Sequence, residues 1–390
     1  MHLDWLIVGG GIHGVHLALV LRERCRIAAD RIRIIDPYDH LLVRWESCTT
    51  ACGMRYLRST VVHHLAPAPY DLLRFARHIN ADVHHFHGRY QRPSLAIFQA
   101  HAQSLIRQYR LSDYTLQGRV CGLRRRSTFW EVETDQGMLS ARHVLLAVSC
   151  GEQLRWPAWA RELRKAGAAV YHLYEPTFAL DQIAAHSAVA IIGGGISAGH
   201  LALNLYQKTQ VTLLMRRPIQ VAPFDSPPGW MGPKELRRFH AEPDPTRRRT
   251  MITAARLPGT MPVELAQSLH AAAQQQQLQI VIDEVHAATI ADGAITLQLT
   301  HHRLAVTTVI LATGFTSERP GHPWLDNAIA YNELPTAPCG YPLIGPDLQW
   351  APGLFVSGPL AELEIGPVAR NIIGARHTSE RLARQYTDGS

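Results

Sequence analysis

The sequence is poor in cysteine and has no long apolar run. Its six cysteines, among 390 residues, follow neither a paired nor a zinc-binding spacing, so no disulfide framework or zinc site is predicted. Apolar runs such as LLAV at 145–148 and VILAT at 309–313 are far shorter than the roughly 20 residues of a membrane helix. Met1 leads directly into LDWLIV with no basic region, so no secretory signal is apparent. A cytoplasmic protein without a membrane segment is expected.

Concentrated positive charge is also missing, although the formal net charge is +7. Arginines occur in every segment, and no basic stripe with interleaved aromatic residues is present, so no nucleic-acid partner is predicted. The surplus is instead expected to help hold anionic cofactors. The 22 histidines include HHFH at 84–87 but no HExxH or comparable spacing, so no metal site is predicted.

A glycine-rich stretch occurs twice, as GGGIHGVHLAL at 9–19 and as GGGISAGHLAL at 193–203. The first copy follows the strand-like LDWLIV at 3–8 and opens a helical pattern, which is the order of a dinucleotide-binding turn. A second β-branched run, IRII at 32–35, ends in Asp36, where such folds place a carboxylate on the ribose hydroxyls. The residues predicted to bind this first cofactor are Gly9, Gly10, Gly11, His13, Gly14 and Asp36.

The second copy repeats this order, with strands expected at 188–194, 210–215 and 308–315. Ala198 takes the place of the third glycine, an accepted variant. The second strand ends in Arg216 and Arg217, which can fork onto a ribose 2′-phosphate. Two solvated arginines at a strand end are the structural alternative. The first site is therefore predicted to hold FAD and the second NADPH, through Gly193, Gly195, Ile196, Ser197, Arg216 and Arg217.

The predicted fold is α/β, with two Rossmann-like dinucleotide-binding domains. Short alternating strands over 114–149 read as a β-meander returning to the first sheet. A strand, a glycine turn and a long helix from about Pro367 are expected at 353–382, packed against the first domain. The predicted boundaries are an FAD domain at 1–150 and 312–390, a linker at 151–185, and an inserted NADPH domain at 186–311 whose proline-rich loop, 218–262, contains one short helix.

The two glycine motifs, the ATGF at 312–315, the strand with arginines at 211–217 and the GPVARNIIGAR at 366–376 resemble the class B flavin monooxygenases. Within these, the chain is most similar to the lysine and ornithine N-hydroxylating monooxygenases. Trp45 and the GMRYLRS at 53–59 resemble the segment beneath the flavin ring in that family. The resemblance adds these cofactor-binding candidates: Trp45, Met54, Arg55, Thr313, Gly314, Gly358, Pro359 and Pro367.

In the chemistry that this resemblance implies, NADPH reduces the flavin at nitrogen 5, dioxygen adds at carbon 4a, and bound NADP⁺ protects the peroxyflavin from water. The cofactor carries the difficult step, so no catalytic side chains are assigned. The implied function is monooxygenation of a small nucleophile, in particular an amine nitrogen. Amino-acid hydroxylation is not carried over, because Arg55 stands where the family has a glutamine and PPGWMG follows Asp225 and Ser226.

Two other functions stay open from the sequence. Cys48 and Cys52 lie where dithiol flavoprotein reductases keep a redox pair, but their spacing is CxxxC rather than CxxxxC. Buried, inert cysteines are the alternative there. The chain could also be a non-catalytic protein that senses NADPH. The expected partners are a small-molecule substrate and dioxygen, and a homo-oligomer is compatible with the sequence.

Overall fold

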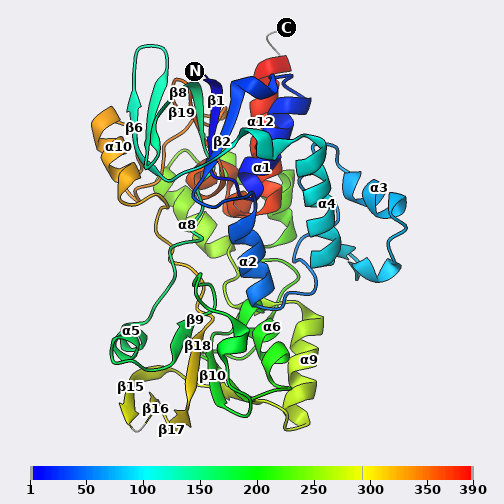
Figure 1. Ribbon diagram of the computed structural model, residues 1–390, viewed down its shortest axis with the longest axis vertical. Coiled ribbons are helices and arrows are strands. Elements are labelled where there is room, and N and C mark those ends of the chain that lie inside the picture. Colours follow the sequence, from blue (N-terminus) through cyan, green and yellow to red (C-terminus); the bar gives the residue numbers. More distant parts are fainter. Residues whose placement is uncertain (1–2, 292, 388–390) are drawn as a thin grey trace.

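The computed structural model describes residues 3–291 and 293–387, and its two largest β-sheets, both mainly parallel, lie in the upper and the lower half of the molecule as drawn in Figure 1. The first sheet has the order β19-β20-β8-β1-β2-β5, and β7 joins β6 to β8. Its strands are β1 (Leu3–Val8), β2 (Ile32–Asp36), β5 (Thr115–Gln117), β6 (Val120–Arg125), β7 (Trp130–Thr134), β8 (Gly137–Leu146), β19 (Gln349–Ala351) and β20 (Leu354–Val356). The predicted α/β class with Rossmann-like sheets is confirmed.

The centre of the first sheet is buried on both faces. Strand β1 pairs in parallel with β2 and β8, and its Leu6 and Ile7 have no exposed surface. Near-continuous apolar strands of this kind are typical of a parallel sheet covered by helices. Helix α1 (Ile12–Glu23) connects β1 to β2 and packs against α12 (Ile372–Thr387), so the two ends of the described chain meet on this sheet (Figure 1). The predicted β-meander is present as β6, β7 and β8, which pair antiparallel.

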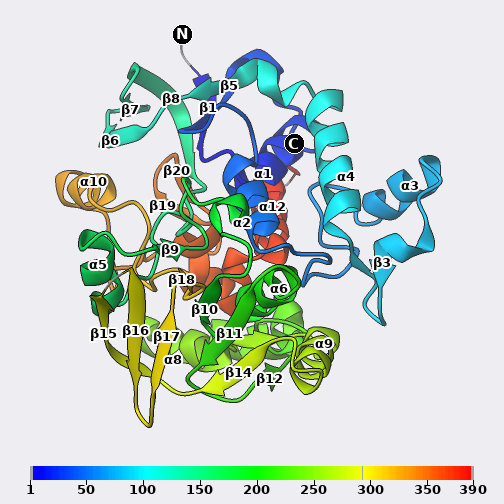
Figure 2. The ribbon, with the colours of Figure 1, turned by 60° about the horizontal axis from the view of Figure 1, so that its bottom comes forward.

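The second sheet has the order β14-β11-β10-β18-β9, and its pairs are all parallel. Its strands are β9 (Val170–His172), β10 (Ala188–Ile192), β11 (Gln210–Met215), β14 (Gln279–Ile282) and β18 (Thr308–Leu311). Helix α6 (Ile196–Leu205) follows β10 and packs on α9 (Val263–Gln274). A small antiparallel sheet of β15 (Val285–Ala291), β16 (Ala294–Leu299) and β17 (Arg303–Val306) extends this half of the molecule (Figure 2).

The segment 151–185, predicted as a linker, is structured. It contains α5 (Ala158–Lys165), preceded by Pro157, and β9, which forms the edge of the second sheet beside β18. Leu163 and Val170 are buried in the core of that sheet. The prediction of a linker was wrong because β9 is only three residues long and its pairing partner lies far along the chain.

The proline-rich segment 218–262 is also more ordered than predicted. It contains two helices, α7 (Pro233–Ala241) and α8 (Pro245–Ala255), rather than one. Each helix has proline in its first turn, where the missing N–H group has no consequence, and Asp244 caps α8 by accepting from the amide of Thr246. Phe239 is buried in the core of the first sheet rather than the second. The segment therefore reaches back across the molecule (Figure 1).

The helix expected from Pro367 begins later. Residues Pro367–Arg370 form a 3₁₀ turn, and Asn371 is extended before α12 begins at Ile372. Pro367 is therefore the first residue of a 3₁₀ turn and not of the long helix. Further helices cover the first sheet or surround the junction: α2 (Val43–Ala51), α3 (Asp71–His78), α4 (Leu95–Gln108), α10 (Trp324–Asn332) and α11 (Glu362–Ile365). In the described residues, no helix is long and apolar enough to cross a membrane.

Candidate functional site

The first glycine turn lies between β1 and α1. Gly9 has φ +115°, and a Cβ there would be 2.6 Å from the carbonyl oxygen of Ala147, so only glycine fits. A Cβ on Gly14 would be 1.8 Å from the carbonyl oxygen of Gly9, which shows how closely the helix starts against the turn. A Cβ on Gly10 would press on Leu41 and Asp36. Contacts with backbone atoms thus require glycine at Gly9 and Gly14, whereas Gly10 is crowded only by side chains.

Gly11 differs from the other three. Its φ of −79° and ψ of −166° are open to any residue, and a Cβ there would meet no atom within 4 Å. Packing therefore does not explain a glycine at this position. Gly11 precedes the first turn of α1, whose free amide groups and dipole favour an anion. Unfilled space at the helix N-terminus fits the close approach of a pyrophosphate.

Asp36 ends β2 beside this turn. Its Oδ2 accepts from the amide of Gly10 at 2.5 Å, and its Oδ1 accepts from the amide of Tyr38 at 3.1 Å. Burial raises the pKa of Asp36, and the two amides partly counter this by favouring the carboxylate. The carboxylate is therefore held rigidly at the turn, and the remaining lone pairs of its oxygens can accept from ribose hydroxyls.

His13 connects the turn to the C-terminal segment. Its Nδ1 lies 2.8 Å from Ser357 Oγ, and its Nε2 lies 3.1 Å from the carbonyl oxygen of Asn371. Burial lowers the pKa of His13 to about 4, so the ring is neutral. With Nε2 as the donor to Asn371, Nδ1 accepts from the serine. Both ring nitrogens are engaged within the protein, which makes His13 a residue that positions the turn rather than one that holds a ligand through its ring.

The remaining C-terminal candidates lie in two short turns, and the first of these turns reaches His13. Gly358 has φ +64°, and a Cβ there would be 3.8 Å from His13 Nδ1. Pro359 belongs to the same 3₁₀ turn, Gly358–Ala361, and Pro367 begins the next one, Pro367–Arg370. Both prolines are buried. The structure therefore brings this segment and the first glycine turn together, as predicted.

The second glycine turn repeats the first one. Gly193 has φ +151°, and a Cβ there would be 2.5 Å from the carbonyl oxygen of Ala312, as Gly9 faces Ala147. Gly195 has an extended backbone, and a Cβ there would touch only Cα of Gly259, at 3.6 Å. Ala198 is fully buried in the position of the third glycine. The turn leads into α6 with Ile196 and Ser197 as its first residues.

Arg216 and Arg217 lie at the end of β11 and are both exposed. Arg216 forms a loose ion pair with Glu284, with its Nη1 3.7 Å from Oε1. The Nη2 atom of Arg217 lies 3.9 Å from the position of a Cβ on Gly259, the residue beside Gly195. Arg217 therefore lies near the second glycine turn through Gly259, whereas the guanidinium of Arg216 is directed to Glu284.

Thr313 and Gly314 follow β18 and come directly after Ala312, the residue that Gly193 of the second turn faces. Thr313 Oγ1 donates to the carbonyl oxygen of Arg155, and Gly314, with φ +73°, has open space at its Cβ position. The next residue, Phe315, stacks on Tyr174 with ring centroids 5.1 Å apart, and the Tyr174 hydroxyl hydrogen-bonds Ser197. Sequence reasoning missed Tyr174 because it lies in the segment predicted as a linker.

Trp45, Met54 and Arg55 lie in and after α2, between the two sheets (Figure 1). Trp45 packs on Phe98 with centroids 5.1 Å apart, and Met54 contacts the cores of both sheets. Arg55 is exposed beside Tyr56. The structure thus brings Met54 to the junction of the two halves, while Trp45 packs against the core of the first sheet and Arg55 faces solvent.

Arg58, in the same segment, is a further junction residue that the sequence did not single out. Its guanidinium donates to the carbonyl oxygens of Ala222 and Phe224, at 2.9 and 2.6 Å, and to Thr260 Oγ1 at 2.6 Å. Burial lowers the pKa of Arg58. This side chain therefore ties the segment after α2 to two segments of the inserted region, 222–224 and Thr260, the residue after Gly259. No local pattern signals such a long-range contact.

Cys48 and Cys52 are free thiols at the same junction. Cys48 lies in α2, and Cys52 follows its last residue, fully buried. Burial raises the pKa of both thiols, that of Cys52 to about 11. A redox thiol needs a lowered pKa and access to its partner. This setting therefore suits the inert alternative and gives no support to a dithiol reductase.

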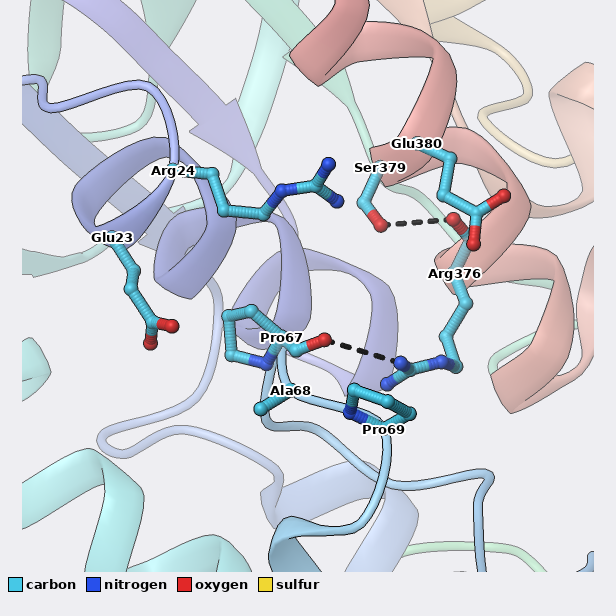
Figure 3. A pocket seen from close by; sticks show the side chains of 8 residues that line it. All are labelled: Glu23, Arg24, Pro67, Ala68, Pro69, Arg376, Ser379 and Glu380. Carbon is cyan, nitrogen blue, oxygen red and sulfur yellow. Dashed lines mark hydrogen bonds between the residues drawn. The ribbon is translucent and has the colours of Figure 1, made fainter.

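A cavity of about 390 Å³ opens at the other end of α1 (Figure 3). Glu23 and Glu380 balance Arg24 and Arg376 in its wall, and Arg376 donates to the carbonyl oxygen of Pro67 at 3.1 Å. With a rise of about 1.5 Å per residue, α1 separates this cavity from Gly11 by about 18 Å. The cavity is therefore not part of the cofactor site.

Two glycine turns of the same geometry, each at the carboxyl end of a parallel sheet, define a two-dinucleotide flavoprotein. The family model for L-lysine 6-monooxygenase/L-ornithine 5-monooxygenase matches residues 121–317, about half of the chain. The chain belongs to this family. It is thus an FAD- and NADPH-dependent monooxygenase of the amine N-hydroxylating type. No curated protein matches the chain.

Solved structures share the fold over the whole chain. The ornithine hydroxylase of Pseudomonas aeruginosa superimposes with a TM-score of 0.78 at 17% identity, covering 100% of this chain and 99% of that one. The FAD-bound cadaverine monooxygenase of Erwinia amylovora has a TM-score of 0.76 at 14% identity, covering 100% and 95%. The ornithine N-hydroxylase of Kutzneria sp. 744, with reduced FAD, NADP⁺ and L-ornithine, has a TM-score of 0.76 at 15% identity, covering 100% of both.

Proposed function

We propose that this monooxygenase hydroxylates the nitrogen of a small primary amine, using FAD, NADPH and dioxygen. The family gives the reaction type. The observation that carries the assignment to this chain is the pair of glycine turns whose second glycines, Gly11 and Gly195, leave space beside a helix N-terminus.

FAD is proposed to occupy the first turn. The amides after Gly11 would hold the pyrophosphate, Asp36 the adenosine ribose, and the Trp45–Met54 segment the flavin ring at the junction. His13 keeps the turn joined to the Gly358–Pro359 turn. The FAD domain then comprises residues 1–150 and 312–390, with α7 and α8 of the inserted segment packed on it.

NADPH is proposed to occupy the second turn, in a domain that runs from residue 151 to residue 311 because β9 belongs to its sheet. Gly193 and Gly195 would admit the pyrophosphate, Ser197 would donate to it, and Arg217 with Arg216 would hold the 2′-phosphate. Thr313 and Gly314 border the same space. Tyr174, stacked on Phe315, hydrogen-bonds Ser197 at this turn and shares a hydrophobic core with Cys52 at the end of α2.

FAD held at the first turn would supply the acceptor for hydride from NADPH and the means of activating dioxygen. The chain's own residues hold the two cofactors at one junction and exclude water from it. Burial of Cys52 and Tyr174 shows that this junction is closely packed. A cytoplasmic location is proposed, because six free cysteines and a dependence on NADPH suit a reducing compartment.

The test is a coupled measurement on purified, FAD-loaded protein. NADPH oxidation, oxygen consumption and hydroxylamine formation are followed with a panel of primary amines, each compared with its N-acetyl derivative as a control. Amine-dependent hydroxylamine formation supports the proposal. Steady NADPH oxidation without any hydroxylated product contradicts it, and no NADPH oxidation at all favours a sensor.

A further inference from the structure

The chain passes between the two halves of the molecule at two places. At the first place, residues 151–155 leave the half that contains the first sheet, and residues 312–316 return to it (Figure 1). These two stretches lie side by side, because Leu154 forms a β-bridge with Phe315. Two short connections paired at one place form a hinge, so contacts elsewhere must fix the orientation of the second half.

At the second place, the chain leaves the second half after β12 (Gln220–Val221) and returns at β13 (Thr260–Met261), and these two strands pair in parallel. The residues between them form α7 and α8, and Phe239 of α7 is buried in the core of the first sheet. This second crossing, residues 220–224 and 259–261, includes Gly259, whose Cα lies 3.6 Å from the position of a Cβ on Gly195. A shift of the second crossing would therefore move one flank of the second glycine turn.

Arg58, in the segment after α2, binds both parts of the second crossing. Its guanidinium donates to the carbonyl oxygens of Ala222 and Phe224 in the outgoing part. In the returning part it donates to the carbonyl oxygen of Thr260 at 3.3 Å and to Oγ1 of the same residue at 2.6 Å. A planar guanidinium has enough donors to join several backbone groups at once, which the single ammonium of lysine does not match. Arg58 therefore joins the two parts of the crossing to each other and to the first half.

Arg92 forms a second contact of this kind. It begins β4 (Arg92–Pro93), is buried, and pairs through Nη2 with Oε1 of Glu264 in the first turn of α9. Tyr90, just before it, packs edge-on against Phe224 of the second crossing, with ring centroids 4.9 Å apart. Helix α9 packs in turn on α6, which starts at the second glycine turn. Two arginines of the first half thus hold the second crossing and the helix that follows it.

We propose that Arg58 and Arg92 are positioning residues that fix the orientation of the NADPH-binding half for hydride transfer. The inference rests on the proposed placement of NADPH at the second glycine turn. In hydride transfer, two electrons and one hydrogen pass from the nicotinamide, which is left as NADP⁺, to FAD. The step requires donor and acceptor atoms about 3–3.5 Å apart, and a displacement of about 1 Å can lower its rate about 100-fold. Loss of either arginine should therefore slow hydride transfer more than it weakens the binding of NADPH.

Anaerobic stopped-flow mixing of the FAD-loaded protein with NADPH measures this step. Varying the NADPH concentration separates the rate of flavin reduction at saturation from the Kd for NADPH. We expect Arg58→Met to lower the saturating rate at least about tenfold and to change the Kd less than about threefold. Arg58→Lys should give an intermediate rate, because lysine keeps the charge but replaces the fork by a single ammonium.

Two further variants make the test specific. Glu264→Gln weakens the ion pair of Arg92 from its more exposed partner, so it tests the same contact without a change in the core. We expect it to lower the saturating rate at least about threefold. Arg89→Met is the matched control, because Arg89 is exposed and lies three residues before Arg92. It should leave both the rate and the Kd unchanged.

Hydrogen exchange in the flavin-free protein provides a measurement that needs no cofactor. The amide of Ala222 donates to the carbonyl oxygen of Met261 at 3.0 Å and so reports on the second crossing. Arg58→Met should make the amides of residues 220–224 exchange at least about fivefold faster, and Arg89→Met should not, because exchange follows local opening of the structure.

Saturating rates of flavin reduction equal to that of the wild type in both Arg58→Met and Glu264→Gln would overturn the positioning role. A higher Kd for NADPH with an unchanged saturating rate would also overturn it, because the arginines would then act on binding alone. Absence of flavin reduction in the wild type would count against the proposed function. Hydrogen exchange would still decide in that case whether Arg58 holds the second crossing, and unchanged exchange in Arg58→Met would overturn that contact.

Discussion

The replacement of Gly11 by alanine should weaken cofactor binding without destabilising the protein, so it distinguishes a glycine needed for a ligand from one needed for packing. A Cβ at Gly11 meets no protein atom within 4 Å, and the backbone there is extended. The free energy of unfolding of the flavin-free protein should therefore change by less than about 1 kcal/mol, with a slight gain because alanine restricts the unfolded chain. If the pyrophosphate approaches this position, the methyl group prevents at least one amide contact. The loss of about 1.5–3 kcal/mol weakens FAD binding about 10- to 150-fold.

The assay is titration of the flavin-free protein with FAD, combined with urea unfolding followed by circular dichroism. Gly195→Ala is the matched variant in the second turn, and it should lower the affinity for NADPH while leaving that for FAD unchanged. Gly14→Ala is the packing control, since its Cβ would be 1.8 Å from the carbonyl oxygen of Gly9 and should destabilise the flavin-free protein itself. Wild-type affinity for FAD in the Gly11→Ala protein would refute the assignment of this turn.

Three further predictions concern charge, acid and thiols. Arg217→Ala should raise the KM for NADPH about 10- to 150-fold through the loss of a 2′-phosphate contact, and hardly change that for NADH; similar changes for both nucleotides would show that the arginine serves another purpose. Burial lowers the pKa of His13 to about 4 and of His16 to about 3 from an ordinary 6.5, so their neutral forms stabilise the fold above about pH 6.5 and this stability falls as the pH drops towards 4. Protonation of each histidine should lower the free energy of unfolding by about 2 kcal/mol between pH 7.5 and 5, as measured by urea unfolding. His16→Asn should make the free energy of unfolding less dependent on pH over this range. An equally steep dependence in wild type and variant would argue against a contribution of His16. Cys48→Ser and Cys52→Ser should leave NADPH-coupled oxygen consumption intact. If anaerobic titration showed that the wild type takes up four electrons per flavin and the variants two, the dithiol reductase hypothesis would be favoured instead.

The cofactor turns could be predicted from the sequence because their geometry is local. Strand, glycine turn and helix are consecutive, and the requirement for glycine at Gly9 and Gly193 arises from contacts that every such turn makes with the neighbouring strand. The repeat of the motif and the arginines at the end of β11 likewise predicted two sites of different nucleotide preference. The family resemblance rested on the same short segments, and the family match confirms it.

Other features depend on contacts between distant parts of the chain. The strand β9 was not predicted because three residues acquire a strand's hydrogen bonds only from β18, about 140 residues later. Proline and arginine content suggested a loop at 218–262, but burial of Phe239 against the first sheet stabilises helices there. The ion pairs of the buried Glu362 with Arg249 and Arg370 likewise carry no local signal, because their partners lie far apart in the sequence or on another element. Local backbone chemistry determined the two cofactor turns, whereas only tertiary packing decided what lies between them, because buried charges and short strands are stabilised by partners that the sequence does not place nearby.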